Sequence, residues 1–260
     1  GDVYKRQVTK DPAIPSVIED VFEKARHYQV GVDSTGTPRY CDNFINDYYD
    51  DEGWWALAWI EASKLTGEKK YLDMAEIIFD DMTTGWSDAC GGGIFWKKNP
   101  LHYKNSIANN LFSLTAIRLY KATQNPAYLD WFKKNVDWYT QTGMINTDIY
   151  QIEDGTKDDC TPNRNAHYTY NQGVAIAVLA EMYLQTNDKS YLELAEKIAD
   201  ATITTQLVTD EGILREMKPE IDDSNDGVQF KGIFIRHLAF LYEVTKLSLI
   251  HISEPTRLDV

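Results

Sequence analysis

One sequence pattern recurs four times along this chain and limits its possible folds more than any other feature. Each copy begins with a small residue and an apolar segment, followed by a threonine. In the first three copies, a Tyr-Leu pair and a second helical segment come next. The marker threonines are spaced 57, 63 and 59 residues apart, at Thr66, Thr123, Thr186 and Thr245. A pattern that returns at such a spacing predicts a chain of repeated supersecondary units.

Each copy predicts two helices joined by a short turn. The first segments are apolar almost all round, as in VAIAVLA from Val174 to Ala180, and such a helix is buried on every side. The second segments are amphipathic, as in YLELAEKIADA from Tyr191. This alternation predicts two concentric rings of helices, an all-α (α/α)6 toroid. An open solenoid is the alternative, although its two helix sets are usually more equal in burial.

The repeat length sets the expected extent of this toroid. Six hairpins of this size need roughly 360 residues, so the chain holds about four of the six hairpins and the toroid is incomplete. We expect helices at 11–28, 52–65, 70–83, 107–122, 126–141, 172–186, 189–206 and 231–246. The loops at 85–106, 143–170 and 207–230 are too long to be mere connections, and long loops tend to carry functional sites.

The two ends of the chain depart from the repeat. The opening GDVYKRQ and the closing SLIHISEPTRLDV resemble translated sequencing-adapter read-through, and Ile250 and His251 stand where the fourth copy should have Tyr-Leu. We therefore expect non-native tails at 1–7 and 248–260, flanking a partial toroid domain at 8–247.

Charge and composition exclude several classes of function. A net charge of -14 repels phosphate backbones and anionic lipids, so we expect no nucleic-acid partner. The chain has no stretch of 18 apolar residues that could span a membrane. Cys41, Cys90 and Cys160 are widely spaced and form no C-x-x-C motif, which supports neither a zinc site nor a disulfide framework. A neutral substrate such as a polysaccharide is compatible with this surface.

Polar residues recur where the apolar helices begin. The positions fifteen and fourteen residues before the marker threonines hold Asp51, Ala108, Asn171 and Phe230, and then Glu52, Asn109, Gln172 and Lys231. In a ring these helix ends converge on one cavity, where free N–H groups and helix dipoles favour carboxylates. Simple helix capping is the alternative explanation for such residues.

One Asp-Asp pair lies at such a helix start. The dipeptide occurs at 50–51, 80–81, 158–159 and 222–223, but only Asp50-Asp51 is followed at once by a Trp-rich helix. Glycoside hydrolysis needs two carboxyl groups around the bond to be broken, one protonated and one ionised. Two carboxylates this close cannot both ionise easily, so one retains its proton near neutral pH.

Five motifs together resemble glycoside hydrolase family 76, whose best-known members are endo-α-1,6-mannanases with an (α/α)6 toroid. They are YYDDEGWWALAWIEA from Tyr48, GGGIFW (91–96), KNSIANN (104–110), YTYNQG (168–173) and QFKGIFIRHL (229–238). The resemblance implies a retaining mechanism with Asp50 as nucleophile and Asp51 as general acid/base, without metal or cofactor.

The motifs also supply candidate substrate-binding residues. We expect Trp54, Trp96 and Tyr170 to stack on mannose rings, although Trp54 could equally belong to the core. Hydrogen bonds to sugar hydroxyls are expected from Asn109, Asn171, Gln172 and Lys231. Trp55 and Trp59, one helical turn apart, are expected in the core.

These observations predict a retaining hydrolase of α-1,6-mannosidic bonds that cleaves mannan internally. A mannan transglycosylase of the same fold and a non-catalytic glycan-binding toroid are the alternatives. We expect a monomer, and a polysaccharide substrate suggests a location outside the cell, at its surface or in the periplasm.

Overall fold

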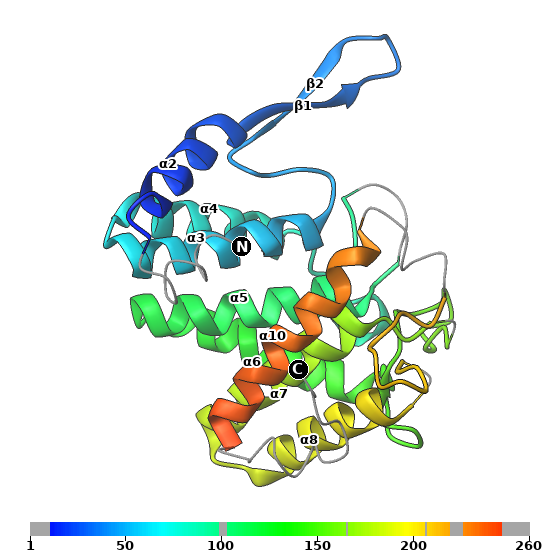
Figure 1. Ribbon diagram of the computed structural model, residues 1–260. Coiled ribbons are helices and arrows are strands. Elements are labelled where there is room, and N and C mark those ends of the chain that lie inside the picture. Colours follow the sequence, from blue (N-terminus) through cyan, green and yellow to red (C-terminus); the bar gives the residue numbers. More distant parts are fainter. Residues whose placement is uncertain (1–10, 99–102, 165, 206, 219–225, 246–260) are drawn as a thin grey trace. The chain divides into compact units, whose positions relative to one another are not determined.

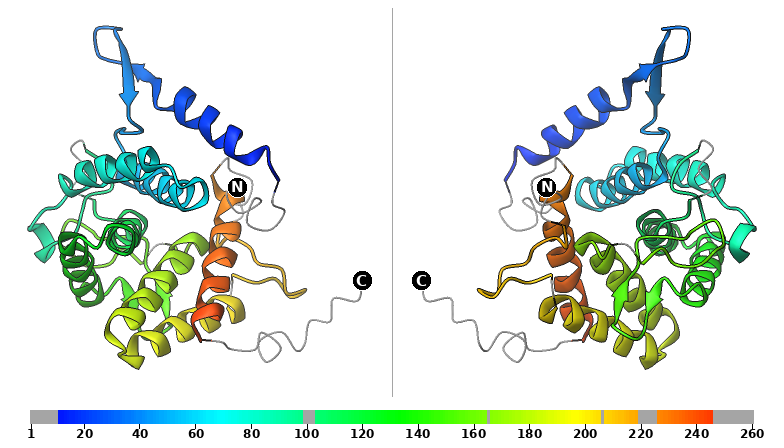
Figure 2. Two further views of the ribbon diagram at one scale, coloured as in Figure 1. Left: turned by 90° about the vertical axis from the view of Figure 1, so that its left-hand side faces the viewer. Right: turned by 90° about the vertical axis from the view of Figure 1, so that its right-hand side faces the viewer.

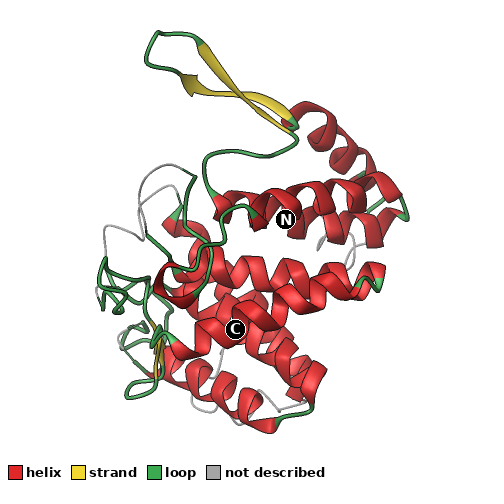
Figure 3. Ribbon diagram, turned by 180° about the vertical axis from the view of Figure 1, so that it is seen from behind, coloured by secondary structure: helices red, strands yellow, loops and turns green. Residues whose placement is uncertain are grey.

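The computed structural model describes residues 11–98, 103–164, 166–205, 207–218 and 226–245, and they are mostly helical (Figures 1 and 3). The predicted tails at 1–7 and 248–260 lie outside these residues. The elements in chain order are α2 (Ile14–Ala25), β1 (His27–Val32), β2 (Pro38–Asp42), α3 (Tyr49–Thr66), α4 (Lys69–Thr83), the 3-10 turn η1 (Ala89–Gly91), α5 (Ser106–Thr123), α6 (Pro126–Gln141), β3 (Ile145–Asn146), β4 (Gln151–Ile152), α7 (Thr169–Thr186), α8 (Lys189–Thr204) and α10 (Gly227–Thr245).

All eight predicted segments contain a helix, but several boundaries differ from the prediction. Helices α3, α7 and α10 begin at Tyr49, Thr169 and Gly227, three or four residues earlier than expected. Helix α2 ends at Ala25, and the residues after it form the antiparallel ribbon β1–β2, which the sequence analysis did not predict. A second short antiparallel ribbon, β3–β4, lies in the predicted long loop at 143–170.

The chain divides into two compact units. Unit 1 comprises Gly1–His102 and Leu111–Asn135, and unit 2 comprises Tyr103–Asn110 and Val136–Val260. In unit 1, Trp59 is buried and stacks in parallel on Trp55 and Tyr71, each at a ring separation of 5.6 Å. The ring of Phe22, from α2, meets Trp59 edge-on at 5.0 Å. The expectation that Trp59 belongs to the core is thus confirmed.

The marker threonine is the joint between the two helices of a repeat. Thr66 donates its hydroxyl to the carbonyl of Ala62 at 2.9 Å and accepts from the N–H of Glu68 at 3.2 Å. Thr123 and Thr186 make the same two bonds to equivalent backbone groups. The next residue is left-handed in each case, at Gly67, Gln124 and Asn187, and its N–H bonds back into the helix. The threonine hydroxyl therefore links the last turn of the first helix to the backbone N–H that precedes the second helix.

The tyrosine of the Tyr-Leu pair ties successive repeats together in unit 1. The Tyr71 hydroxyl donates to Glu19 of α2 at 2.7 Å, and the Tyr128 hydroxyl donates to Glu76 of α4 at 2.9 Å. Burial and the neighbouring carboxylate raise the pKa of both tyrosines. A neutral hydroxyl thus links each amphipathic helix to the preceding one.

Unit 2 is built around α7, which packs against α8 and α10 (Figure 2). Every residue of α7 from Asn171 to Met182 is buried, as predicted for an apolar first helix. Helix α10 differs, because Val228 and Ile235 are more than half exposed. The prediction of all-round burial is therefore right for α7 and wrong for α10.

The cysteines correct another expectation. Cys90 and Cys160 are disulfide-bonded, whereas Cys41 is a buried free thiol. Spacing along the chain gave no sign of disulfide bonding, because disulfide formation depends on distance in space. Among the described helices, none combines the length and the apolarity needed to cross a bilayer.

Candidate active site

The first turn of α3 carries three consecutive acidic residues in three different environments. Tyr48 precedes the helix in an extended conformation and gives it no side-chain cap. Free N–H groups at a helix start favour negative charge, so Asp50, Asp51 and Glu52 are well placed by the helix dipole. Asp51 is exposed, Asp50 is partly buried and Glu52 is completely buried.

Asp50 accepts a side-chain hydrogen bond at one of its two carboxyl oxygens. The indole N–H of Trp96 donates to its Oδ2 at 3.0 Å. Its Oδ1 is buried and has no hydrogen-bond partner among the described residues. Burial raises the pKa of Asp50 to about 7, the charge of Asp51 adds to this rise, and the Trp96 hydrogen bond partly offsets it. Asp50 can therefore carry or release a proton near neutral pH.

Asp51 is exposed and accepts a hydrogen bond from an amide. The side chain of Asn46 donates to its Oδ2 at 2.8 Å. The two adjacent carboxyl groups thus lie in contrasting surroundings, and burial raises the pKa of Asp50.

Trp96 owes its position to a short antiparallel pairing with the residues before α3. The N–H of Tyr49 donates to the Trp96 carbonyl at 3.0 Å, and the N–H of Lys98 donates to the Asp47 carbonyl at 2.9 Å. The loop at 85–98 is thereby fastened along the start of α3. Trp54 remains partly exposed one turn into the helix.

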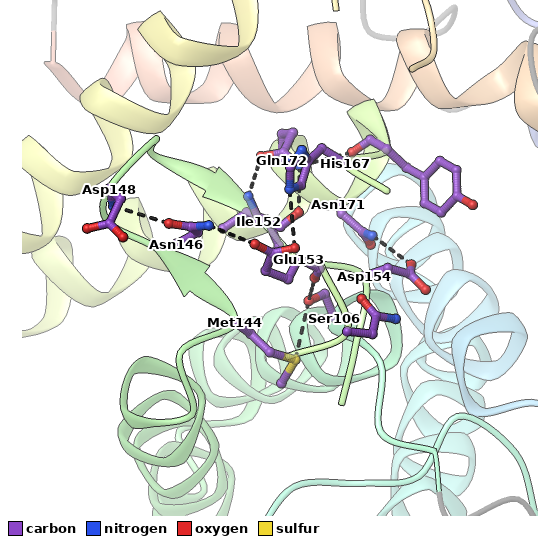
Figure 4. Close-up of polar contacts among 12 residues, drawn as sticks. Ser106, Met144, Asn146, Asp148, Ile152, Glu153, Asp154, His167, Asn171 and Gln172 are labelled. Carbon is purple, nitrogen blue, oxygen red and sulfur yellow. Dashed lines mark hydrogen bonds and ion pairs between the residues drawn. The ribbon is translucent and has the colours of Figure 1, made fainter. Parts of the chain in front are cut away.

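Unit 2 holds a second polar cluster, centred on Asp154 (Figure 4). The Asn171 amide donates to Asp154 Oδ1 at 3.0 Å, and the Tyr103 hydroxyl donates to Oδ2. Asn163 donates to the Tyr103 oxygen at 2.9 Å. The side-chain oxygens of Asn171 and Asn163 are buried without a hydrogen-bond partner among the described residues. The cluster can therefore accept hydrogen bonds from a hydroxyl-bearing ligand.

Gln172 is committed to the backbone of the β3–β4 loop. Its side-chain oxygen accepts from the N–H of Ile152 at 2.8 Å, and its side-chain nitrogen donates to the Ile152 carbonyl at 3.0 Å (Figure 4). The side chain is fully buried. Both of its hydrogen-bonding groups thus serve to place the residues that lead to Asp154.

The other predicted binding residues of unit 2 lie at helix starts. Tyr170 stacks in parallel on Phe230 of α10, with ring centroids 3.9 Å apart. Asn109 is fully buried and donates to the carbonyl of Asn105, the residue before α5, at 2.8 Å. Lys231 is partly exposed on α10. The ring faces of Tyr170 and Phe230 that meet are closed to a sugar, so stacking must use the opposite face.

Sequence reasoning missed several polar residues that shape this cluster. Glu153 is buried beside Asp154, accepts from Asn146 at 2.8 Å and pairs with His167 at 3.2 Å. Glu216 is buried and accepts from the N–H of Thr169, at the start of α7, at 3.0 Å. The Glu-Asp-Gly sequence in a long loop was the available signal. The structure explains its glycine, because a Cβ at Gly155 would lie 2.5 Å from the Tyr103 oxygen.

The predicted site residues thus fall into two sets. Asp50, Asp51 and Trp96 meet in unit 1, together with Trp54 on the same helix, whereas the remaining candidates belong to unit 2. That the two sets line a single cavity stays a prediction.

Several proteins of known structure resemble this chain in sequence and in fold. The Lin0763 protein of Listeria innocua is 32% identical, with a TM-score of 0.78 over 93% of this chain and 65% of that chain. The α-1,6-mannanase GH76A of Salegentibacter sp. HEL1_6 is 26% identical, with a TM-score of 0.77 over 94% of this chain and 68% of that chain. An inactive variant of the latter, with two consecutive aspartates replaced by asparagine, was solved with α-1,6-mannotriose. The structural neighbours in this family are (α/α) toroids, which confirms the predicted fold class.

Several curated relatives carry the name mannan endo-1,6-alpha-mannosidase. Mannan endo-1,6-alpha-mannosidase DCW1 of Saccharomyces cerevisiae is 29% identical over 235 residues, which is 84% of this chain and 51% of that protein. The chain spans about half the length of the curated relatives it matches. The sequence profile described as glycosyl hydrolase family 76 matches residues 3–252. Since this match covers nearly the whole chain, the protein belongs to glycosyl hydrolase family 76.

Proposed function

We propose that the protein is a retaining glycoside hydrolase that cleaves α-1,6-mannosidic bonds within mannan. The observation that carries the proposal is the pair of consecutive aspartates at 50 and 51. Asp50 is partly buried and accepts a hydrogen bond from Trp96, whereas Asp51 is exposed. The loss of activity when two consecutive aspartates are replaced in the Salegentibacter mannanase supports it. The names of the relatives favour hydrolysis over transfer or binding alone.

The proposed reaction has two steps, with one carboxyl group for each role. Ionised Asp50 attacks the anomeric carbon, while Asp51 donates its proton to the departing oxygen. Asp51 then takes a proton from water, which attacks the anomeric carbon and releases Asp50. The Trp96 hydrogen bond holds the Asp50 carboxyl group in one orientation.

Aromatic and polar side chains supply the proposed contacts with the sugar. Trp54, Trp96 and Tyr170 supply stacking surfaces for mannose rings, and Asn109, Asn171 and Lys231 hydrogen-bond the hydroxyls. Gln172 instead supports the backbone of Ile152.

We also propose that the protein acts as a monomer outside the cell, at its surface or in the periplasm. The disulfide-bonded Cys90 and Cys160 support an oxidising compartment, because disulfides persist there and are rare in the cytosol.

The direct test is incubation with linear α-1,6-mannan, followed by chromatography of the oligosaccharides and NMR of the anomer formed first. We expect a ladder of short oligosaccharides whose new ends keep the α configuration. An unchanged polymer would refute the hydrolase, and an initial β anomer would refute the retaining mechanism. Adding an acceptor sugar would reveal transfer as a mixed product.

The acidic side of the pH profile tests the role of Trp96. Asp50 must be ionised to attack, so kcat/KM should fall as pH drops below its pKa of about 7. Because the Trp96 N–H stabilises the ionised form, Trp96→Phe should raise this pKa and move the acidic limb upward by about one pH unit. Trp86→Phe is the matched control, since its indole donates to exposed Asp88 instead. An acidic limb that stays in place or moves downward would contradict this role.

A further inference from the structure

Lys98 joins three segments of unit 1 beside the proposed nucleophile. Its Nζ lies 2.7 Å from Glu52 Oε1 and 2.5 Å from Asp81 Oδ2, so it links the first turn of α3 to α4. Its ammonium also lies over the ring of Tyr49, 5.4 Å from the ring centroid. The lysine side chain is only 25% exposed, and Glu52 is not exposed at all.

The completely buried Glu52 is costly to ionise without such a partner. An isolated buried carboxylate is strongly unfavourable, and removing one member of a buried pair leaves the other uncompensated. Burial raises the pKa of Glu52 to about 8, although the hydrogen bond and the charge of Lys98 act in the opposite direction. The ammonium of Lys98 therefore has a fixed place, set by two acidic groups on two helices.

The backbone of Lys98 transmits this fixed place to Trp96. The Lys98 N–H bonds to the Asp47 carbonyl, and Trp96, two residues earlier, accepts from the N–H of Tyr49. Between them, Lys97 forms a bridge with Tyr48. Anchoring the lysine side chain thus holds the pairing that brings the Trp96 indole to 3.0 Å from Asp50.

We propose that Lys98 is a positioning residue that acts on Asp50 through Trp96, by tethering the 96–98 segment to Glu52 and Asp81. The inference deepens the proposed function and rests on it. Lys98 itself need not touch the substrate.

The test compares Lys98→Met, Trp96→Phe and the double variant in kcat and KM on linear α-1,6-mannan. We expect Lys98→Met to lower kcat about tenfold to 100-fold with little change in KM, because small displacements of catalytic groups cost this much. If lysine acts through the tryptophan, the double variant is no slower than the slower single variant. Lys98→Arg, which keeps the charge and can reach both acids, should restore most of the rate.

Two further variants separate positioning from loss of folding or charge. Lys69→Met removes another ion-paired lysine, from the pair with Asp73 on the exposed side of α4, and should leave the rate unchanged. Glu52→Gln combined with Lys98→Met leaves no uncompensated charge at position 52 and should fold, yet remain slow. Losses that multiply in the Lys98–Trp96 double variant, or a wild-type rate for Lys98→Met, would overturn the inference.

A titration of Asp50 tests the inference even if the wild-type protein does not cleave mannan. The absence of cleavage would refute the proposed function alone. The difference in unfolding free energy between wild type and Asp50→Asn, followed against pH, reports the ionisation of Asp50. Lys98→Met should move its midpoint upward, and the shift should vanish in the Trp96→Phe background. A shift that persists in that background would overturn the proposed route through Trp96.

Discussion

Replacing Asp50 with asparagine will abolish mannan cleavage, with kcat/KM falling by about 10⁴-fold. The neutral amide cannot attack the anomeric carbon, so no glycosyl-enzyme forms, even though the side chain keeps nearly the same size and can still accept from Trp96. Initial rates on linear α-1,6-mannan provide the measurement. Asp80→Asn, which removes an exposed carboxylate of another Asp-Asp pair, is the matched control and should leave the rate unchanged. Retention of more than a few per cent of the activity would rule out Asp50 as the nucleophile.

The same substitution should stabilise the folded protein at alkaline pH. The pKa of Asp50 is about 7 in the folded protein, against an ordinary value of 3.8, so the folded state binds more protons between these two pH values. The wild-type unfolding free energy therefore falls as pH rises through this window. A shift of about three pKa units corresponds to about 4 kcal/mol, which partial exposure of the side chain reduces to about 2 kcal/mol.

Chemical denaturation at two pH values checks this expectation. Asparagine stays neutral throughout, so the stability gain of Asp50→Asn over wild type should be small at pH 4 and largest at pH 8. A gain of equal size at both values would mean that ionisation of Asp50 is not its cause. A pH-dependent gain together with lost activity would identify Asp50 as a residue retained for function at the expense of stability.

The second large effect is expected at the contact between α7 and α10. A Cβ added at Gly173 would lie 2.6 Å from the Cα of Phe234 and 3.3 Å from the carbonyl of Ile233. These are backbone atoms, so the two helices must separate to admit a methyl group. Gly173→Ala should therefore lower the unfolding free energy by about 1–3 kcal/mol in urea denaturation.

Gly232→Ala is the matched control within α10. A Cβ at Gly232 meets nothing within 4 Å, and the residue is exposed in the helix. Alanine loses less conformational freedom than glycine in a helix, so this substitution should stabilise the protein by about 0.5–1 kcal/mol. Shifts of the same sign for both variants would contradict the close approach at Gly173.

The repeat made the helices predictable because its signals act over short distances. Thr66 bonds to Ala62 and Glu68, and equivalent bonds end α5 and α7, so the spacing of threonines marks real helix ends. The amphipathic pattern likewise located α6 to the residue. Helix starts were less predictable, because α3 and α7 begin on Tyr49 and Thr169 without a side-chain cap of their own.

The candidate binding residues show where pattern alone was insufficient. Gln172 and Asn171 stand next to each other, and both were assigned to sugar hydroxyls. In the structure, the side-chain oxygen and nitrogen of Gln172 both bond to the backbone of Ile152, 20 residues away. Asn171 instead has a buried side-chain oxygen without a hydrogen-bond partner among the described residues. No sequence periodicity distinguishes these two outcomes, because loop residues remote in sequence supply the partners.

The sequence by itself determined the helical hairpins, the threonine joints and the place of Asp50 and Asp51 at a helix start. Each depends on hydrogen bonds and side-chain periodicity within a few residues, which the order of amino acids states directly. Only the tertiary structure decided that Asp50 is the more buried of the pair, that Trp96 reaches it from 46 residues away and that Lys98 compensates Glu52. Burial and long-range contacts set the pKa values of these groups, and they exist only once distant segments have packed together.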